Sequence, residues 1–100
     1  MQLYQAEWCP HSHKVRQKLT ELGIDFVSRQ VPAEPDERGA MKRATGTNEI
    51  PVLLTDDGAM LKGEEEILPY LDRFDERPDA RRHRAKAREE VPEFSEVRAA

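Results

Sequence analysis

A regular alternation of strand and helix patterns most constrains the fold of this chain. Residues 2–6 suit a short strand, and residues 26–31 suit a second one. Between them, Val15, Leu19 and Leu22 recur at helical spacing, which places their side chains on one face of a helix. Because strand, helix and strand follow one another directly, the sequence predicts a right-handed crossover between two parallel strands.

Turn and breaker residues organise the middle of the chain. Pro35 is suited to open a second helix, which Gly46 would end. Residues 51–55 and 59–62 then flank Asp56-Asp57-Gly58, a sequence typical of a β-hairpin. These two strands are therefore expected to pair antiparallel and to complete a mixed sheet.

A last helical pattern follows, and its apolar residues are Ile67, Leu68, Leu71 and Phe74. Pro69 weakens this prediction unless it lies in the first turn, where its missing N–H group costs little. The order of elements is then β-α-β-α-β-β-α. It predicts an α/β domain over residues 1–76, with a mixed four-stranded sheet and three helices, followed by a charged extension over residues 77–100.

The composition limits the classes of function that the chain can have. One hundred residues allow a single domain, and no apolar run approaches the roughly 20 residues of a membrane helix. The N-terminus lacks a secretory signal pattern, so we expect a soluble, cytoplasmic protein with no membrane partner. The formal net charge of −4 argues against nucleic-acid binding by the domain as a whole.

The charge is unevenly distributed, since residues 1–76 are acidic and residues 77–100 are basic. Residues 79–90 either form a fourth, solvated helix that Pro92 would end, or are disordered. The arginines of this extension either contact an acidic partner or RNA, or cover the acidic domain. Interleaved acids and a lack of aromatic residues argue against RNA.

Cys9 is the only cysteine, which excludes an internal disulfide and an all-cysteine metal cage. It lies where the first strand meets the first helix, and Pro10 is a favoured first helical residue. The free N–H groups of that turn would favour a thiolate nucleophile. His11 and Lys14 would add positive charge, whereas Glu7 opposes it. The alternative is a small buried hydrophobic residue.

Ser12 follows Cys9 by one helical turn, so its hydroxyl could donate to the thiolate or simply satisfy the helix start. A serine cannot resolve a mixed disulfide, so any redox cycle needs an external thiol. His11 and His13 could suggest a metal site with Cys9. Alternate helical residues point in different directions, however, and we therefore expect no metal.

Three short motifs follow one another in a recognisable order. The first is Trp8-Cys9-Pro10-His11-Ser12, the second is Ile50-Pro51-Val52-Leu53, and the third is Gly63-Glu64-Glu65-Glu66-Ile67. Together they resemble the thioredoxin-fold proteins of the glutaredoxin type, including the N-terminal domain of glutathione transferases. The motifs match the active-site helix, the strand with the family's cis-proline, and the start of the last helix. The resemblance covers about three-quarters of the chain.

The resemblance implies glutathione as co-substrate and Cys9 as the nucleophile, with Pro10 and Ser12 beside it. Pro51 matches the cis-proline, and the backbone of Ile50 would pair with the cysteinyl unit of glutathione. The residues implied for glutathione binding are Trp8, His11, Arg38, Ile50, Pro51, Glu64 and Glu65.

Within this set, Arg38 would face the glycine carboxylate of glutathione, and Glu65 would accept from the γ-glutamyl amine. The N–H groups of Glu64 and Glu65 would hold the γ-glutamyl carboxylate at the helix start. The alternatives are a solvated position for Arg38 and acids that only complement the helix dipole.

Three departures from the family pattern bear on function. Ala6 replaces a frequent cation, and Glu64 adds a negative charge near a ligand carboxylate. Pro10 also departs from the glycine typical of members that assemble iron–sulfur clusters, so no cluster is expected.

These observations favour a monothiol glutaredoxin-like enzyme. It would act through Cys9 on glutathionylated proteins, with glutathione or another small thiol as its partner. The alternative is a non-catalytic adaptor that resembles the transferase N-domain. Transferase chemistry would need a helical second domain, which residues 77–100 are too short to supply.

Overall fold

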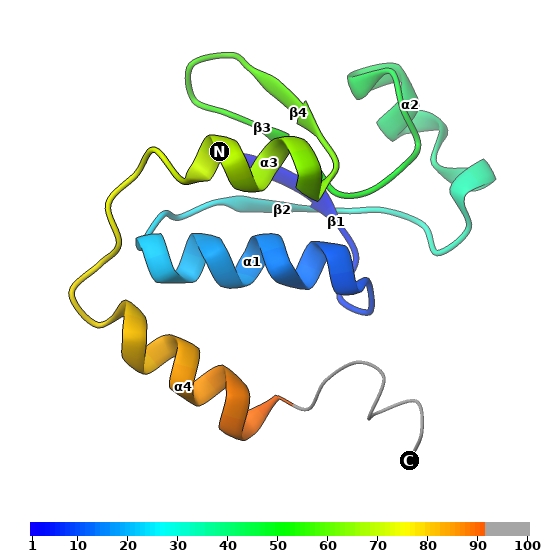
Figure 1. Cartoon of the computed structure of the whole chain (residues 1–100). Helices are drawn as coiled ribbons and strands as arrows, with labels where there is room; N and C mark the ends of the chain where they lie inside the picture. Colours follow the sequence, from blue (N-terminus) through cyan, green and yellow to red (C-terminus); the bar gives the residue numbers. More distant parts are fainter. Residues whose placement is uncertain (92–100) are drawn as a thin grey trace.

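The computed structural model describes residues 1–91 and confirms the predicted α/β architecture (Figure 1). The sheet has the order β2-β1-β3-β4, with β1 parallel to β2 and antiparallel to β3, and β3 antiparallel to β4. The strands are β1 (Gln2–Gln5), β2 (Val27–Gln30), β3 (Val52–Leu54) and β4 (Met60–Lys62). The helices are α1 (Pro10–Leu22), α2 (Gly39–Thr45), α3 (Glu64–Leu71) and α4 (Ala80–Glu90), with a short 3-10 helix η1 at Pro35–Glu37.

The core lies between the sheet and the helices α1 and α3. Burial alternates along β1, so Leu3 faces inward and is fully buried. The predicted apolar face of α1 meets it there. The buried cluster consists of Leu3, Val15, Leu19, Leu22, Leu53, Ile67 and Leu71.

The prediction that Pro35 opens α2 is wrong. Pro35 begins η1 instead, and Arg38 separates this turn from α2 with φ −89° and ψ 42°. The Arg38 N–H closes η1 on the Pro35 carbonyl, and the Arg38 carbonyl accepts from Lys42 as α2 begins. Gly46 ends α2 as expected, with φ 81°.

Pro69 lies inside α3 and not in its first turn. The proline removes one intrahelical donor, but Ile67 and Leu71 on either side are fully buried and hold the helix on the core. The helix ends at Leu71, so Phe74 lies beyond it and packs edge-on against Tyr70, with ring centroids 5.8 Å apart. The apolar pattern therefore identified the packing face correctly but extended the helix too far.

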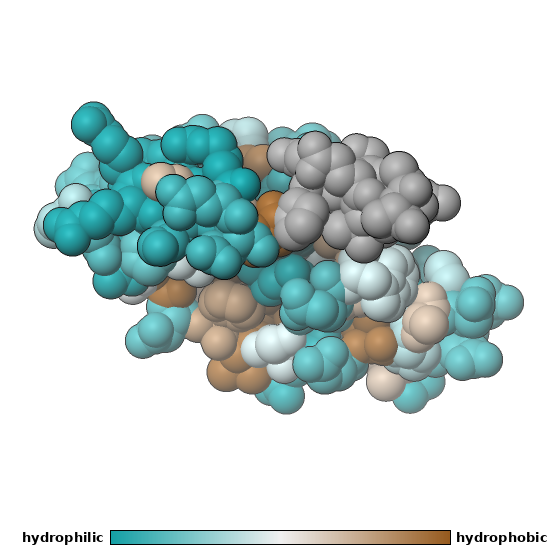
Figure 2. Space-filling model, turned by 90° about the horizontal axis from the view of Figure 1, so that it is seen from below, coloured by the Kyte–Doolittle hydropathy of each residue, from teal (hydrophilic) through white to brown (hydrophobic). Residues whose placement is uncertain are grey.

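The charged extension forms a helix over the residues of α4, and α4 packs against α1 (Figure 1). The face of the molecule that contains α4 is mostly hydrophilic when it is seen from below (Figure 2). Pro92, which the sequence predicts to end the helix, lies outside the described residues. No helix of residues 1–91 has the length and apolar character required to cross a membrane.

Arg84 links α4 to the domain through hydrogen bonds with two glutamates. Its Nη1 donates to Oε1 of Glu21 on α1 at 2.7 Å and to Oε1 of Glu76 at 2.8 Å. The Glu21 carboxylate is nearly buried and also accepts from Nε2 of Gln17 at 3.1 Å. The hydrogen bond from Arg84 lowers the pKa of Glu76. The basic extension thus does contact the acidic domain.

Glu21→Ala is expected to lower the free energy of unfolding by about 2 kcal/mol, because hydrogen bonds to a charged group in a buried position are lost. Urea unfolding followed by circular dichroism measures this change. Glu76→Ala is the matched control, because it removes the exposed partner of the same arginine and should leave stability nearly unchanged. If both variants lose the same free energy of unfolding, the buried Glu21 carboxylate stabilises the protein no more than the exposed Glu76 carboxylate does.

Candidate functional site

Cys9 is the N-cap of α1, in the turn that follows β1. Its backbone is extended, with φ −81° and ψ 120°, and Pro10 occupies the first helical turn. The Cys9 Sγ atom accepts the main-chain N–H of Ser12 at 3.5 Å, and the residue is 6% exposed. A helix start therefore directs a hydrogen-bond donor at the sulfur, an arrangement that favours negative charge.

The Ser12 hydroxyl contacts the main chain of the turn that precedes α1. Its Oγ atom accepts the N–H of Ala6 at 3.4 Å, and the residue is fully buried. The main-chain N–H of Ser12 is the group that contacts the Cys9 sulfur. The hydroxyl therefore closes the turn between β1 and α1, which is the structural alternative considered above.

The loop before β3 meets the start of α3. The peptide bond between Ile50 and Pro51 is cis. The Pro51 carbonyl accepts the N–H of Gly63 at 2.8 Å, which ties the loop to the residue that caps α3. Gly63 has φ 81° and ψ 157°, a conformation essentially limited to glycine.

A cleft of about 350 Å3 lies between these segments. It contains five predicted site residues, namely His11, Ile50, Pro51, Glu64 and Glu65. Its other lining residues are Thr47, Glu49, Lys62, Gly63 and Glu66. The sequence reasoning missed Thr47, Glu49 and Lys62, although each lies within three residues of a recognised motif in the chain.

Glu64 links the starts of α1 and α3. Its Oε1 lies 2.6 Å from Nδ1 of His11, and its Oε2 lies 3.5 Å from Nζ of Lys14. Burial would raise the pKa of Glu64, but the hydrogen bond with His11 and the charge of Lys14 outweigh it, so the pKa is lowered. The Oε2 atom is buried and accepts no hydrogen bond within the described part of the chain. Glu64 is therefore a firmly anionic group at the cleft.

The other predicted site residues do not line this cleft; they are Trp8, Cys9, Pro10, Ser12 and Arg38. Arg38 is 4% exposed, and its guanidinium donates to the carbonyls of Pro32, Ala33 and Asn48 at 2.8 to 2.9 Å. These bonds hold the loops on either side of α2, and they correct the expectation that Arg38 faces a ligand carboxylate. Trp8 is 53% exposed beside Cys9.

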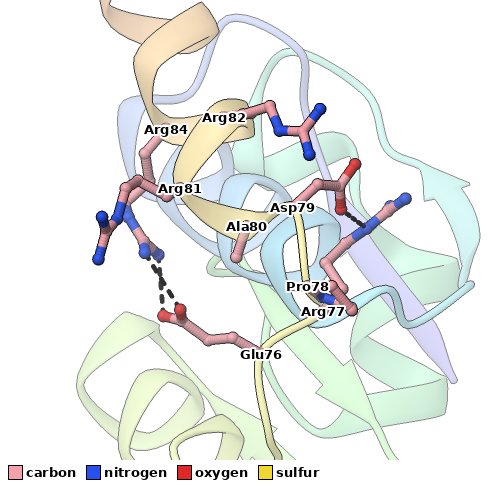
Figure 3. A pocket seen from close by; sticks show the side chains of 8 residues that line it. All are labelled: Glu76, Arg77, Pro78, Asp79, Ala80, Arg81, Arg82 and Arg84. Carbon is pink, nitrogen blue, oxygen red and sulfur yellow. Dashed lines mark hydrogen bonds and ion pairs between the residues drawn. The ribbon is translucent and has the colours of Figure 1, made fainter.

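A second cavity, of about 340 Å3, lies where α4 begins (Figure 3). Arg84 reaches Glu76 there, and Arg77 pairs with Asp79 at 2.5 Å. The cavity shares no residue with the cleft and includes no predicted site residue. Over residues 1–91, no group of three or more His, Cys, Asp or Glu side chains is arranged to hold a metal ion.

Solved structures of glutathione transferases are similar to this chain. A glutathione S-transferase domain-containing protein from Marinobacter aquaeolei is 34% identical, with a TM-score of 0.63 over 75% of this chain and 39% of its own. A glutathione S-transferase from Rhodospirillum rubrum is 27% identical, with a TM-score of 0.61 over 72% of this chain and 32% of its own. A glutathione transferase from Methylococcus capsulatus gives the same identity and TM-score, over 72% of this chain and 36% of its own. The chain thus spans about a third to two fifths of the length of these proteins.

No match was found among the curated proteins. A sequence model of the glutaredoxin family, in contrast, matches residues 1–59. This match includes the Cys9 motif, the cis-proline and the hairpin turn, and it covers more than half of the chain. Together with the thioredoxin-like sheet and the transferase-like neighbours, it shows that the chain belongs to the glutaredoxin family.

Proposed function

We propose that the protein is a monothiol thiol–disulfide oxidoreductase that uses Cys9 and glutathione or a similar small thiol. The observation that carries this proposal is the position of the Cys9 sulfur at the start of α1, where it accepts a main-chain N–H group. His11, two residues later, lines the cleft between α3 and the cis-proline. The catalytic unit in this proposal is the domain of residues 1–76. A reducing compartment such as the cytoplasm would supply the thiol.

The proposed reaction has two exchange steps. The Cys9 thiolate attacks the glutathione sulfur of a mixed disulfide, a new bond forms between the two sulfurs, and the substrate thiolate leaves with the electron pair and takes up a proton. A second glutathione thiolate then attacks the glutathione sulfur held on Cys9. This step yields oxidised glutathione and restores the Cys9 thiolate. Because Ser12 offers no second thiol, the external thiol is obligatory.

The cleft suggests how glutathione would lie. The backbone of Ile50 would pair with the cysteinyl unit, and the N–H groups of Glu64 and Glu65 would face the γ-glutamyl carboxylate. The Glu65 carboxylate would accept from the γ-glutamyl amine. His11 and the exposed ring of Trp8 would contact the ligand beside Cys9. Arg38 is left out of this proposal because backbone carbonyls occupy its guanidinium.

The experiment that tests this proposal is the reaction of the protein with oxidised glutathione, followed by intact mass spectrometry. We expect glutathione to add to Cys9 faster in the folded protein than in the same protein unfolded in urea, because only the folded chain has the helix start. A folded protein that reacts no faster than the unfolded one would contradict the proposal.

One observation favours a second candidate function, a non-catalytic adaptor. The anionic Glu64 lies at the helix start that would have to hold a ligand carboxylate. A titration with reduced glutathione, followed by amide shifts near Cys9 and Ile50, separates the two functions. An absence of shifts at millimolar glutathione would favour the adaptor.

A further inference from the structure

The cleft lined by His11, Ile50 and Pro51 is strongly acidic. Four of its lining residues are glutamates, whereas Lys62 and His11 are its only basic ones. Glutathione itself carries two carboxylates and one ammonium group. A cleft of one charge sign attracts ligands of the opposite sign and repels those of its own sign. The charge of the cleft therefore opposes a ligand with a net negative charge.

The Glu64 carboxylate also pairs with two basic side chains that a ligand carboxylate would otherwise contact. Its two oxygens lie against His11 and Lys14, at 2.6 and 3.5 Å. These two residues come from the first turns of α1, next to Cys9. The side chain of Glu64 thus stands where a bound carboxylate would neutralise them. The protein supplies this anion itself, so a ligand carboxylate would compete with Glu64 for His11 and Lys14.

The remaining acids are accessible to a ligand. Glu49 and Glu65 are exposed and form no ion pair within residues 1–91. Glu66 is exposed as well, and its Oε1 accepts the main-chain N–H of Lys62 at 2.9 Å, so its negative charge is not neutralised. An amine entering the cleft would thus find carboxylates on both walls, one beside Ile50 and the others on α3.

We propose that the preferred small thiol of this site bears a cationic amine and lacks a carboxylate. The inference rests on the proposed function, because it names the substrate class of the same exchange reaction. The Cys9 thiolate attacks one sulfur of an aminothiol disulfide, forms a mixed disulfide with that half, and releases the other half as a thiolate that takes the electron pair. The amine of the retained half would extend toward the cleft, where the carboxylates of Glu49 and Glu65 are exposed.

The test compares three disulfides of different charge. These are cystamine, which is cationic, bis(2-hydroxyethyl) disulfide, which is neutral, and oxidised glutathione, which is anionic. The rate of Cys9 modification is measured by intact mass for the folded protein and is divided by the rate for the urea-unfolded protein. This ratio removes the intrinsic reactivity of each disulfide. We expect the ratio to be about tenfold higher for cystamine than for oxidised glutathione, with the neutral disulfide between them.

Variants locate the effect. The double variant Glu49→Gln/Glu65→Gln should lose most of the preference for cystamine, as should high salt. Glu64→Gln should instead raise the ratio for oxidised glutathione, because it frees His11 and Lys14. Glu90→Gln, on α4 and outside the cleft, is the matched control and should behave as the parent protein.

The outcomes separate this inference from the proposed function. Folded-state acceleration with all three disulfides but without a preference for cystamine would overturn the inference alone. A preference that survives in the double variant would overturn the role of the cleft carboxylates. An absence of acceleration with every disulfide would overturn the proposed function and the inference with it.

Discussion

Cys9→Ser is expected to lower the turnover of a glutathionylated substrate by at least about a thousandfold, to the uncatalysed level. The sulfur of Cys9 is the group that forms the covalent intermediate in the proposed reaction, and a serine hydroxyl at this position remains protonated near neutral pH. The measurement is the release of glutathione from a glutathionylated peptide, with reduced glutathione present to complete the cycle. Turnover that persists in Cys9→Ser would contradict the mechanism.

Ser12→Ala is the matched control for this experiment. It removes the hydroxyl that accepts from Ala6 but keeps the main-chain N–H that contacts the Cys9 sulfur. We therefore expect Ser12→Ala to retain turnover within about tenfold of the parent protein, because only a neutral hydrogen bond of the turn is lost. A loss as large as that of Cys9→Ser would show that the hydroxyl takes part in the chemistry.

Gly63→Ala is expected to lower the free energy of unfolding by about 2 kcal/mol, because φ 81° and ψ 157° are strained for any residue with a Cβ atom. The added methyl group would also displace the exposed, flexible end of the Glu65 side chain. Gly63 donates to the Pro51 carbonyl, so the strain acts directly on the contact between α3 and the cis-proline loop. Urea unfolding measures the loss, and the rate of Cys9 modification by oxidised glutathione should fall with it.

Gly39→Ala provides the comparison for Gly63→Ala. Gly39 is exposed and begins α2, and a Cβ there would meet only the flexible end of Arg43 at 3.3 Å. Alanine at this position should leave stability unchanged or raise it by up to about 1 kcal/mol. If the two variants lose stability equally, the conformation of Gly63 is not the cause of its effect.

The sequence predicted the fold well where burial and periodicity agree. Val15 and Leu19 repeat at helical spacing, and both are fully buried in α1. Burial could not be predicted for β2, because Val27 is apolar but 53% exposed on an edge strand. The sequence also could not predict that α3 contains Pro69 in its interior. Helix propensity takes no account of the buried residues that hold α3 on the core.

For the candidate site, the motifs predicted which backbone segments come together. Cys9 at the helix start follows from the local sequence, whereas the cis form of Pro51 was implied by the resemblance to the family motif. The partners of Arg38 could not be predicted from the sequence. A long side chain can reach either a ligand or nearby carbonyls, and the fold determines which of them it contacts. Lys62 lines the cleft because β4 pairs with β3, and Glu49 lines it because the loop before β3 meets the start of α3. No single motif encodes these contacts.

The central position of β1 has a consequence for synthesis of the protein. Leu3 on β1 pairs with Leu53 on β3, and Ile67 and Leu71 of α3 complete the core around them. A nascent chain that ends at residue 59, where the family match ends, therefore lacks Ile67 and Leu71, two of the buried side chains that pack around its first strand. Contacts between distant parts of a chain form late, because loop closure must come first. We therefore expect the core to be complete only after α3 has left the ribosome.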